Sequence, residues 1–500
     1  MGKPDRTADA SSNVVPLLCL LITLATILLL PLLVTARGFT PPDDVLRDVA
    51  KAVSGRSWGD VVLLRPDLDP DLRTHAGWEM ILRFLHVVGL SKAALLLVAV
   101  AGLATLAFLP PVLYLRRPEL GLFLLLIAAV LDFDALFWYF YGRPHLIGMF
   151  CVSSLLFLWD RFAAPPANRK LLLLFVAIIA IRAWARSTLI MLGIPLVAVI
   201  ASTVLTRRWR PLAAFIGCLA VGIAIGTLMT GRPIEFLVYN FRHFYVTLFS
   251  DKASAFLVTE LGPLKQSPPI ILLFLAYLGI RTAAGWTPDR LKHPAFLLAL
   301  LGWVLSFFIA RFWFEYGFPA MLVWLALDLQ DVFETRMPRH SLARLGFTVF
   351  CAFALCVAVL KPHADLWRRN PLAEAVNVQR LYAAEPDWLP GEGGVLYAAT
   401  MRVFFTFYHL FPDAPWRYAT GMEPGFMPEG DLRVYETINL TGDASAYLPW
   451  IENLRPPDRM VITLGRETAI DAIFPMLEWR FVEPDYWFGR PPGAKEADAQ

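Results

Sequence analysis

Long apolar segments recur along the first three quarters of the chain, and short polar segments separate them. Uncharged runs such as Val14–Ala36 and Pro211–Gly231 reach the roughly 20 residues that a helix needs to cross about 30 Å of hydrocarbon. The pattern predicts eleven membrane spans, near residues 14–35, 93–115, 119–140, 144–160, 170–186, 187–206, 211–230, 268–282, 293–311, 316–332 and 343–361. We therefore expect an α-helical polytopic membrane protein.

Basic residues gather in every second loop between the expected spans, which predicts the orientation of the chain. Short cytoplasmic loops carry an excess of Lys and Arg. The basic loops hold Arg116/Arg117, Arg161/Arg169/Lys170, Arg207/Arg208/Arg210, Arg281/Arg290/Lys292 and Arg336/Arg339/Arg344. We expect a cytoplasmic N-terminus. Because eleven is odd, the first loop (36–92) and the tail (362–500) are expected on the outer side.

The tail has a different character from residues 1–361, because its apolar runs are too short to span a membrane. It is rich in Pro, Gly, Trp and Tyr. Strands are predicted at 395–399, 416–420 and 459–464, with helices at 401–410 and 444–454. Alternating strands and helices indicate a small parallel α/β layer. We expect a transmembrane domain (1–361) followed by a soluble domain (362–500).

Composition excludes several classes of protein. With 57% hydrophobic and 17% charged residues, the chain is too apolar for an ordinary soluble protein. All five cysteines lie in apolar runs, so neither a disulfide framework nor metal-ligand spacing is present. The sequence contains no G-x-G-x-x-G or G-x-x-x-x-G-K-[ST] motif for a nucleotide. We expect no cofactor and no nucleic-acid partner. Gly222 and Gly226 form a G-x-x-x-G pair, which is a weak sign of close helix packing.

The first loop opens with an acidic pair, Asp43 and Asp44, at the start of an amphipathic helix. Val45, Leu46 and Val49 lie on one face of that helix, which we expect on the membrane surface. A carboxylate at the boundary between water and lipid can serve as a general base. The alternative is structural, since Thr40 followed three residues later by Asp43 has the spacing of a helix cap.

Further along the loop, Asp67, Asp69 and Asp71 have a spacing that can hold a divalent cation through oxygen ligands. Solvated turn residues are the alternative. His75 and Glu79 then share one face of a predicted interfacial helix. They could bind substrate or a metal, but a polar face directed at water explains them more simply. Trp78 lies on the apolar face of the same helix and completes the set of candidate substrate-loop residues, which are Asp69, His75, Trp78 and Glu79.

Four arginines are expected at the outer ends of spans, where the orientation rule does not place positive charge. They are Arg143, Arg182, Arg186 and Arg311. Arg182 lies 12 residues beyond Lys170, about 18 Å along a helix, and is therefore expected within the membrane. Guanidinium groups match phosphate oxygens, so a phosphate or pyrophosphate would account for several of these arginines together. Snorkelling of Arg182 and ion pairing with Asp132, Asp134 and Glu315 are the alternatives.

The order of a span, an outer loop with an acidic pair on an amphipathic helix, a second helix and a further span resembles the membrane-embedded GT-C glycosyltransferases. The segments P-P-D-D (41–44), T-H-A-G-W (74–78), G-R-P-H (142–145) and R-F-W-F-E-Y-G-F-P (311–319), together with the tail, look like bacterial members. The resemblance implies that Asp43 or Asp44 is the catalytic base or a sugar-site carboxylate. The W-W-D-Y-G motif of oligosaccharyltransferases is missing, which counts against a peptide acceptor and favours the metal-free branch that uses lipid-monophosphate sugars.

The resemblance implies a multi-pass enzyme of the bacterial inner membrane whose tail is periplasmic. Such an enzyme would move a sugar from polyprenyl phosphate to a glycan or lipid acceptor, with inversion and without a nucleotide. Two other classes remain open at this stage. An O-antigen-type polymerase or ligase usually has its large Arg/His loop late in the chain, and a transporter would need mid-membrane polar residues or inverted repeats.

Overall fold

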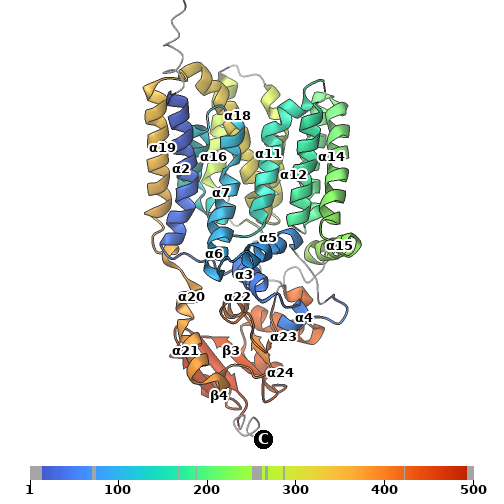
Figure 1. Ribbon diagram of the computed structural model, residues 1–500, viewed down its shortest axis with the longest axis vertical. Helices are drawn as coiled ribbons and strands as arrows, with labels where there is room; N and C mark the ends of the chain where they lie inside the picture. The colour runs from blue at the N-terminus through green and yellow to red at the C-terminus, as the bar shows by residue number, and fades with distance from the viewer. Residues whose placement is uncertain are drawn as a thin grey trace, which may run out of the picture.

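The computed structural model describes residues 14–69, 75–166, 168–186, 188–249, 262–264, 268–284, 288–421 and 423–492. An upright bundle of helices stands above a smaller C-terminal region that contains a sheet (Figure 1). The bundle contains α2 (Val14–Ala36), α6 (Lys92–Leu97), α7 (Leu103–Phe108), α8 (Pro110–Tyr114), α9 (Glu119–Leu131), α11 (His145–Ala163), α12 (Arg169–Ala185), α13 (Gly193–Thr206), α14 (Trp209–Leu228), α16 (Pro269–Ala283), α17 (Pro294–Ser306), α18 (Phe318–Arg336) and α19 (Leu342–Leu360).

Helices occupy all eleven predicted membrane segments. Six described segments are long and apolar enough to cross a membrane by themselves, and they are Val14–Ala36, Lys92–Tyr114, His145–Ala163, Leu189–Thr206, Trp209–Leu228 and Leu342–Leu360. A seventh is added if α9 and the segment Phe133–Phe140, which begins with α10 (Phe133–Phe137), form one span despite a bend of 120°. The polytopic helical architecture is confirmed, and the count of eleven crossings stays a prediction.

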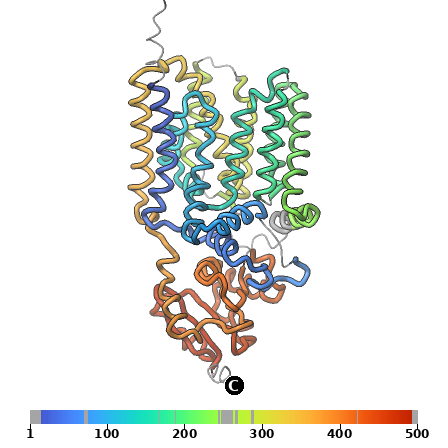
Figure 2. Tube along the Cα trace, viewed as in Figure 1, coloured from blue at the N-terminus to red at the C-terminus, as the bar shows by residue number. Residues whose placement is uncertain are grey.

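Helices that are distant in sequence lie side by side in the bundle. The tube in Figure 2 shows α2, in blue, beside α19, in gold. At the other side, α14 packs closely on α12, as the G-x-x-x-G pair indicates. A Cβ at Gly222 would lie 2.7 Å from Cγ2 of Ile179, and one at Gly226 would lie 2.5 Å from the carbonyl oxygen of Ala180. Larger residues would therefore push these two helices apart.

Residues 171–206 form two helices with a short break, as their length and basic flanks predict. Helix α12 ends at Ala185, and Arg186 is extended, with φ −143° and ψ 131°. A 3-10 turn at Leu189–Leu192 then leads into α13. The helix therefore ends just before Arg186, whose side chain is buried in the bundle.

The C-terminal region contains a five-stranded sheet in the order β2-β1-β3-β5-β4, formed by β1 (Val395–Ala398), β2 (Arg417–Tyr418), β3 (Arg459–Thr463), β4 (Glu478–Val482) and β5 (Tyr486–Arg490). The three predicted strands are parallel, with Leu396 opposite Tyr418 and Arg459. The prediction of a parallel layer is wrong for the rest of the sheet, because β5 and β4 are antiparallel. The helices of this region are α20 (Pro371–Glu374), α21 (Val376–Ala384), α22 (Met401–Leu410), α23 (Glu429–Thr441), α24 (Leu448–Ile451) and α25 (Ile470–Ile473).

The first loop lies between the bundle and the C-terminal region. It forms α3 (Asp44–Ser54), α4 (Trp58–Val61) and α5 (Ala76–Val87), and α15 (Pro233–Phe249) lies at the same level (Figure 1). Helix α3 packs against α5 and α6 on one side and α22 on the other. Its apolar face is therefore fully buried in protein, and the expectation that this face lies on the membrane surface is wrong.

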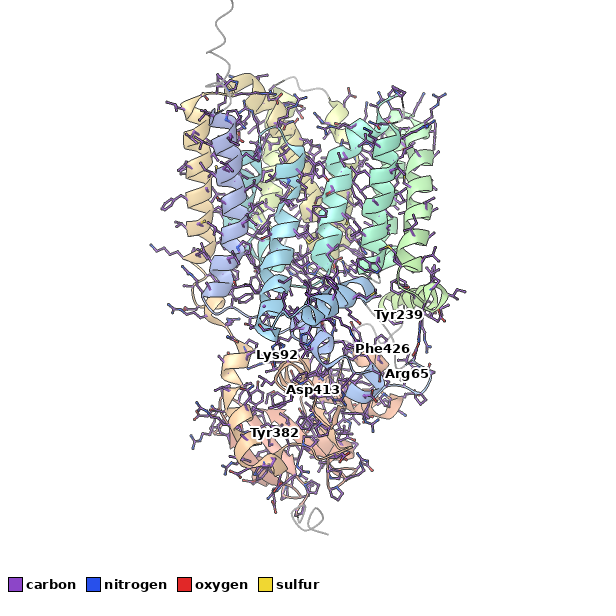
Figure 3. All side chains as sticks on the ribbon, in the orientation of Figure 1. Arg65, Lys92, Tyr239, Tyr382, Asp413 and Phe426 are labelled. Carbon is purple, nitrogen blue, oxygen red and sulfur yellow. The ribbon has the colours of Figure 1, made fainter. Side chains whose placement is uncertain are left out.

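Backbone hydrogen bonds fasten the first loop to the C-terminal region. The N–H of Leu63 donates to the carbonyl of Tyr418 at 2.9 Å, beside a parallel bridge between Val62 and Tyr418, and the N–H of Arg65 donates to Phe426 at 2.9 Å. A side-chain bond adds to these, since the Nζ of Lys92 donates to the carbonyl of His409 at 2.7 Å. Figure 3 labels Arg65, Lys92 and Phe426 along this junction. These bonds hold α3 in a fixed position beneath the bundle.

Candidate functional site

The two acidic residues stand where the first loop becomes α3. Asp43 precedes the helix, and one of its carboxylate oxygens accepts a hydrogen bond from the N–H of Asp44 at 2.6 Å. The structural role that was the alternative for Asp43 is therefore present, with Asp43 rather than Thr40 as the cap. The second oxygen of Asp43 lies 2.5 Å from an Nη of Arg143. One side chain thus both caps the helix and pairs with a candidate phosphate ligand.

Arg143 also approaches Asp44, whose carboxylate lies 3.7 Å from the Nε of Arg143 and 3.0 Å from an Nη of Arg47. The turn at Gly142 brings Arg143 to this position. Gly142 has φ +67°, in the left-handed region, and a Cβ there would lie 3.0 Å from Cγ2 of Val45. Glycine at this position therefore allows the bundle to approach α3 closely.

Positive charge keeps Asp44 ionised. Burial disfavours the charged form, but Arg47 and Arg143 outweigh burial and hold the pKa of Asp44 below its usual value. His75 and Arg311 act in the same direction. The influence of His75 and Arg311 shows that residues from two other parts of the chain lie within electrostatic reach of the start of α3.

Arg186 and Arg311 share one buried carboxylate. The two Nη atoms of Arg186 each donate to Glu315 at 2.6 Å, and the Nε of Arg311 donates to the same carboxylate at 2.5 Å. Arg186 is 2% exposed and Glu315 is 3% exposed. Glu315 lies in a π-helical turn at Trp313–Gly317 that leads into α18. Two guanidinium groups on one carboxylate leave an excess of positive charge.

Arg182 is buried at the last turn of α12 and is 1% exposed, so the snorkelling alternative is wrong. One Nη donates to the hydroxyl and carbonyl of Thr188 at 3.2 and 3.4 Å. Its Nε and other Nη have no hydrogen-bond partner among the described residues. Gly148 on α11 leaves room for the guanidinium, because a Cβ there would lie 2.9 Å from the Nε of Arg182.

His145, at the start of α11, is a further buried polar side chain of this group. Within the part of the chain that the structure describes, neither of its ring nitrogens has a hydrogen-bond partner. It lies within electrostatic reach of Glu315 and Arg186. Buried donors without acceptors are costly unless a ligand satisfies them. The open donors of Arg182 and His145 are therefore suited to an anion.

The ion-pair alternative for the four arginines holds only in part. Arg186 and Arg311 pair with Glu315, as that alternative predicts. Asp132 does not pair with any of the four in the described residues, since its carboxylate accepts from the indole N–H of Trp313 at 2.9 Å and caps α10 through Ala135. Arg143 pairs instead with the first-loop acids.

The substrate-loop candidates separate into two places. Asp69 lies at the surface, 3.1 Å from Arg232, and Asp67 pairs with Arg242. These ion pairs tie the loop to the segment around α15. Asp71 lies outside the described residues. Within the described ranges, no group of three or more His, Cys, Asp or Glu side chains is placed to hold a metal ion.

His75, Trp78 and Glu79 lie at the start of α5, close to the bundle. The helix packs tightly on α12, because a Cβ at Gly77 would lie 2.4 Å from the indole of Trp184. Trp78 and Glu79 are both buried. The expectation that Glu79 faces water is therefore wrong. The exposed large apolar side chains of this segment are Met80, Phe84, Val87 and Val88.

Three residues of the site were not predicted from the sequence. Arg47 and Asp48 lie one turn beyond Asp44, and the i,i+3 and i,i+4 spacing of charges on a helix was an available signal for both. His145 is part of the G-R-P-H segment, but a lone histidine carries no sign of its partners. All three are buried in the structure.

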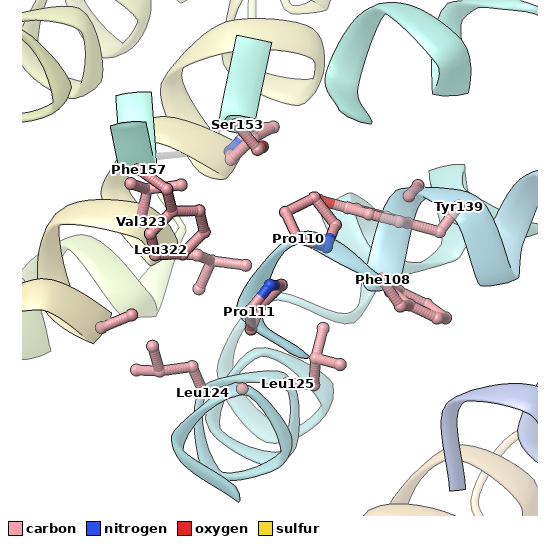
Figure 4. A pocket seen from close by; sticks show the side chains of 14 residues that line it. Phe108, Pro110, Pro111, Leu124, Leu125, Tyr139, Ser153, Phe157, Leu322 and Val323 are labelled. Carbon is pink, nitrogen blue, oxygen red and sulfur yellow. The ribbon is translucent and has the colours of Figure 1, made fainter. Parts of the chain in front are cut away.

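A separate apolar cavity lies deeper in the bundle, between the end of the second membrane segment, α9, α11 and α18 (Figure 4). It is lined by Ala107, Phe108, Pro110, Pro111, Gly121, Leu124, Leu125, Tyr139, Ser153, Phe157, Pro319, Leu322, Val323 and Ala326. Its lining contains no charged side chain and shares no residue with the arginine group. This mostly apolar cavity is therefore separate from the buried arginines at the end of the bundle.

The bundle, the acidic first loop and the small C-terminal sheet together define a polytopic membrane protein with a GT-C-type fold. The structure of ArnT from Cupriavidus metallidurans, bound to undecaprenyl phosphate, is similar to this chain with a TM-score of 0.58 and 14% identity, over 95% of this chain and 98% of that chain. At this identity the similarity is one of fold. No family model matches the chain, and no curated protein matches it in sequence.

Proposed function

We propose that this protein is an inverting glycosyltransferase that moves a sugar from polyprenyl phosphate to a glycan or lipid acceptor at the outer face of the bacterial inner membrane. The observation that carries the proposal is the placement of Arg143 on the acidic start of α3, with Arg186 and Arg311 gathered on Glu315 nearby. Arg143 contacts Asp43, and Arg311 lies within electrostatic reach of Asp44. A phosphate and a hydroxyl that is losing its proton need opposite charges side by side, and this arrangement supplies both.

The open donors of Arg182 and His145 favour a phosphate ligand over a purely structural role. A structural ion-pair network would satisfy its own members, whereas the Nε and one Nη of Arg182 have no acceptor among the described residues. A phosphate oxygen would satisfy such donors with charge-assisted hydrogen bonds. In the proposed reaction, these groups stabilise the charge that develops on the leaving lipid phosphate.

In the proposed step, Asp44 or Asp43 removes the proton of the acceptor hydroxyl while its oxygen attacks the anomeric carbon. The bond from that carbon to the phosphate oxygen breaks, and the lipid phosphate leaves with the electron pair. The GT-C-type fold of the chain supports this reaction class. We also propose the orientation, with the N-terminus cytoplasmic, the first loop and residues 362–500 periplasmic, and no nucleotide required.

The test compares chemistry with transport. Purified protein is incubated with undecaprenyl-phosphate-linked sugars and an extract of membrane glycolipids, and the same protein in liposomes is assayed for sugar-lipid flux. Transfer without flux supports the proposal. Flux without transfer contradicts it and favours a transporter. Polymerisation of lipid-linked oligosaccharide, in place of transfer of a single sugar, would favour a polymerase or ligase.

A further inference from the structure

Asp48 is a buried carboxyl that the proposed reaction does not yet use. It lies one turn beyond Asp44 on α3 and is 2% exposed. Its Oδ1 accepts from the Nε of Arg47 at 3.0 Å, whereas its Oδ2 has no hydrogen-bond partner among the residues that the structure describes. A buried carboxyl oxygen without a hydrogen-bond partner lowers the stability of the folded protein, which suggests a functional role for this residue.

One guanidinium links Asp48 to the reaction site. Nη1 of Arg47 lies 3.0 Å from Asp44, and Nη2 of Arg47 lies 3.0 Å from Asp48. Arg47 is itself buried, so water screens neither contact well. The two carboxylates therefore compete for the same positive charge. Asp44 also contacts Arg143, which connects this group to the proposed phosphate site.

We propose that Asp48 is a positioning residue for sugar transfer, which in its ionised form competes for Arg47 and so leaves Asp44 a stronger base toward the acceptor hydroxyl. The inference rests on the proposed function and assigns a regulator to the same site. The acceptor proton moves to Asp44, and the bonds made and broken are those of the proposed step. Asp48 itself touches neither substrate.

The environment of Asp48 places its titration near neutrality. Burial raises its pKa to about 7, Arg47 opposes this rise, and Asp44 and Glu79 add to it. Below that pH Asp48 is neutral, and the charge of Arg47 acts wholly on Asp44. Above it Asp48 is ionised, draws on Arg47 and repels the charge of Asp44. Both effects raise the basicity of Asp44, so transfer is expected to increase with pH.

Other titratable groups lie on the elements that pack against α3. His75, which precedes α5, acts on Asp44, and burial holds the pKa of its imidazole well below the usual value, so it stays neutral through this range. Glu79 on α5 is an influence on Asp48 itself. On α22, the Nδ1 of His409 donates to the carbonyl of Leu46 at 3.2 Å, and burial, then Lys92, lowers the pKa of His409 to about 4. Lys92 on α6 is bonded to the carbonyl of His409. Glu423, from the C-terminal region, acts on Arg47.

The test is the pH dependence of kcat/KM from about pH 5.5 to about pH 8.5, with release of undecaprenyl phosphate from undecaprenyl-phosphoryl-glucose, -mannose and -arabinose as the probe reactions. In the parent protein the rate should fall by about three- to tenfold as the pH drops through about 7, which is the range that a change of up to one unit in the pKa of a base produces. In Asp48→Asn, kcat/KM should stay at the low value of the parent protein at acidic pH over the whole range. Asp48→Glu should keep the pH dependence.

Asp60→Asn is the matched control, because Asp60 is an exposed carboxylate of the same loop that bonds Ser57. This substitution should leave the pH dependence of kcat/KM unchanged. Binding of undecaprenyl phosphate should be equal in the parent and Asp48→Asn proteins. The inference would be overturned if kcat/KM of Asp48→Asn still fell with decreasing pH as it does in the parent protein. Loss of undecaprenyl phosphate binding in both Asp48 variants would also overturn it. A parent protein that releases no undecaprenyl phosphate from any probe would contradict the proposed function itself.

Discussion

Arg182 offers the sharpest test of the proposed phosphate site, because no carboxylate in the described structure pairs with it. Its charge is buried at the end of α12, and two of its three guanidinium nitrogens have no acceptor among the residues that the structure describes. Arg182→Lys keeps the charge but loses the planar fork. If the open nitrogens bind the donor phosphate, lysine can replace only part of that interaction.

The expected magnitude follows from the number of open donors. A hydrogen bond to a charged group contributes about 1.5–3 kcal/mol. Loss of one such bond should lower kcat/KM by about ten- to a hundredfold, since about 1.4 kcal/mol corresponds to one decade in rate. Arg182→Gln, which also removes the charge, should lower it further. The bonds to Thr188 are long, at 3.2 and 3.4 Å, and contribute less.

Gly148→Ala tests the same site without altering Arg182. The new Cβ would lie 2.9 Å from the Nε of Arg182 and would displace the guanidinium. Gly217→Ala is the matched control, because a Cβ there has no atom within 4 Å in the described structure. Initial rates of undecaprenyl phosphate release and equilibrium binding of undecaprenyl phosphate are measured for all variants. Gly148→Ala should weaken both, and Gly217→Ala neither.

Parental rates and parental lipid-phosphate binding in Arg182→Lys, Arg182→Gln and Gly148→Ala would refute the phosphate role of Arg182. A structural role alone would show a different pattern. Arg182→Gln would then lower the amount of folded protein, while the folded fraction would bind undecaprenyl phosphate with parental affinity.

Three further predictions concern neighbouring features of the site and the orientation of the chain. Glu315→Gln should weaken the ion pair with Arg186. A double-mutant cycle of Glu315→Gln and Arg186→Gln should show a coupling of at least about 1 kcal/mol in the free energy of unfolding, because both partners are buried. Additive effects of the two substitutions would contradict the pairing. Asp44→Asn should fold and insert but lose transfer by about 10²–10⁴-fold, as loss of a general base does, and loss of the protein from the membrane instead would indicate a purely structural role. A reporter that is active only outside the cytoplasm should be active after Pro362 and silent after Arg208; the reverse result would place the first loop in the cytoplasm.

The helical bundle could be predicted from the sequence because the lipid interior offers no hydrogen-bond partners to the backbone. Every backbone polar group must be bonded within its own helix, so long apolar runs have few alternatives. The position of α3 could not be predicted in this way. An apolar helix face is the same pattern whether lipid or protein covers it, and here α22 of the C-terminal region covers Leu46.

The strands β4 and β5 were missed for a related reason. Strand β4 is exposed or half-buried over most of Glu478–Val482, and the buried strand β5 ends in Gly489 and Arg490, so neither strand has a long apolar run. Such short strands are stabilised by their partners rather than by their own pattern. The parallel strands β1 and β3 are buried, so their apolar runs are clear in the sequence.

The arginines could be found from the sequence because a charge at membrane depth is costly and therefore conspicuous. Their partners could not be found, because Arg186 and Glu315 are 129 residues apart and meet only in the folded bundle. Asp48 was missed because an acidic residue on an amphipathic helix is ordinarily solvated. Only the packing of α22 and α5 shows that it is buried.

The most direct test of the proposed function follows both products of one reaction. Purified protein is given a sugar-labelled undecaprenyl-phosphate donor and a membrane glycolipid extract, and labelled acceptor, free undecaprenyl phosphate and the anomeric configuration of the new bond are measured together. The proposed reaction predicts one undecaprenyl phosphate released for each sugar transferred, with inversion at the anomeric carbon, and a strongly reduced yield of both products with Arg182→Gln. Donor that crosses a liposome membrane with its sugar still attached, or transfer that Arg182→Gln leaves unchanged, would contradict it.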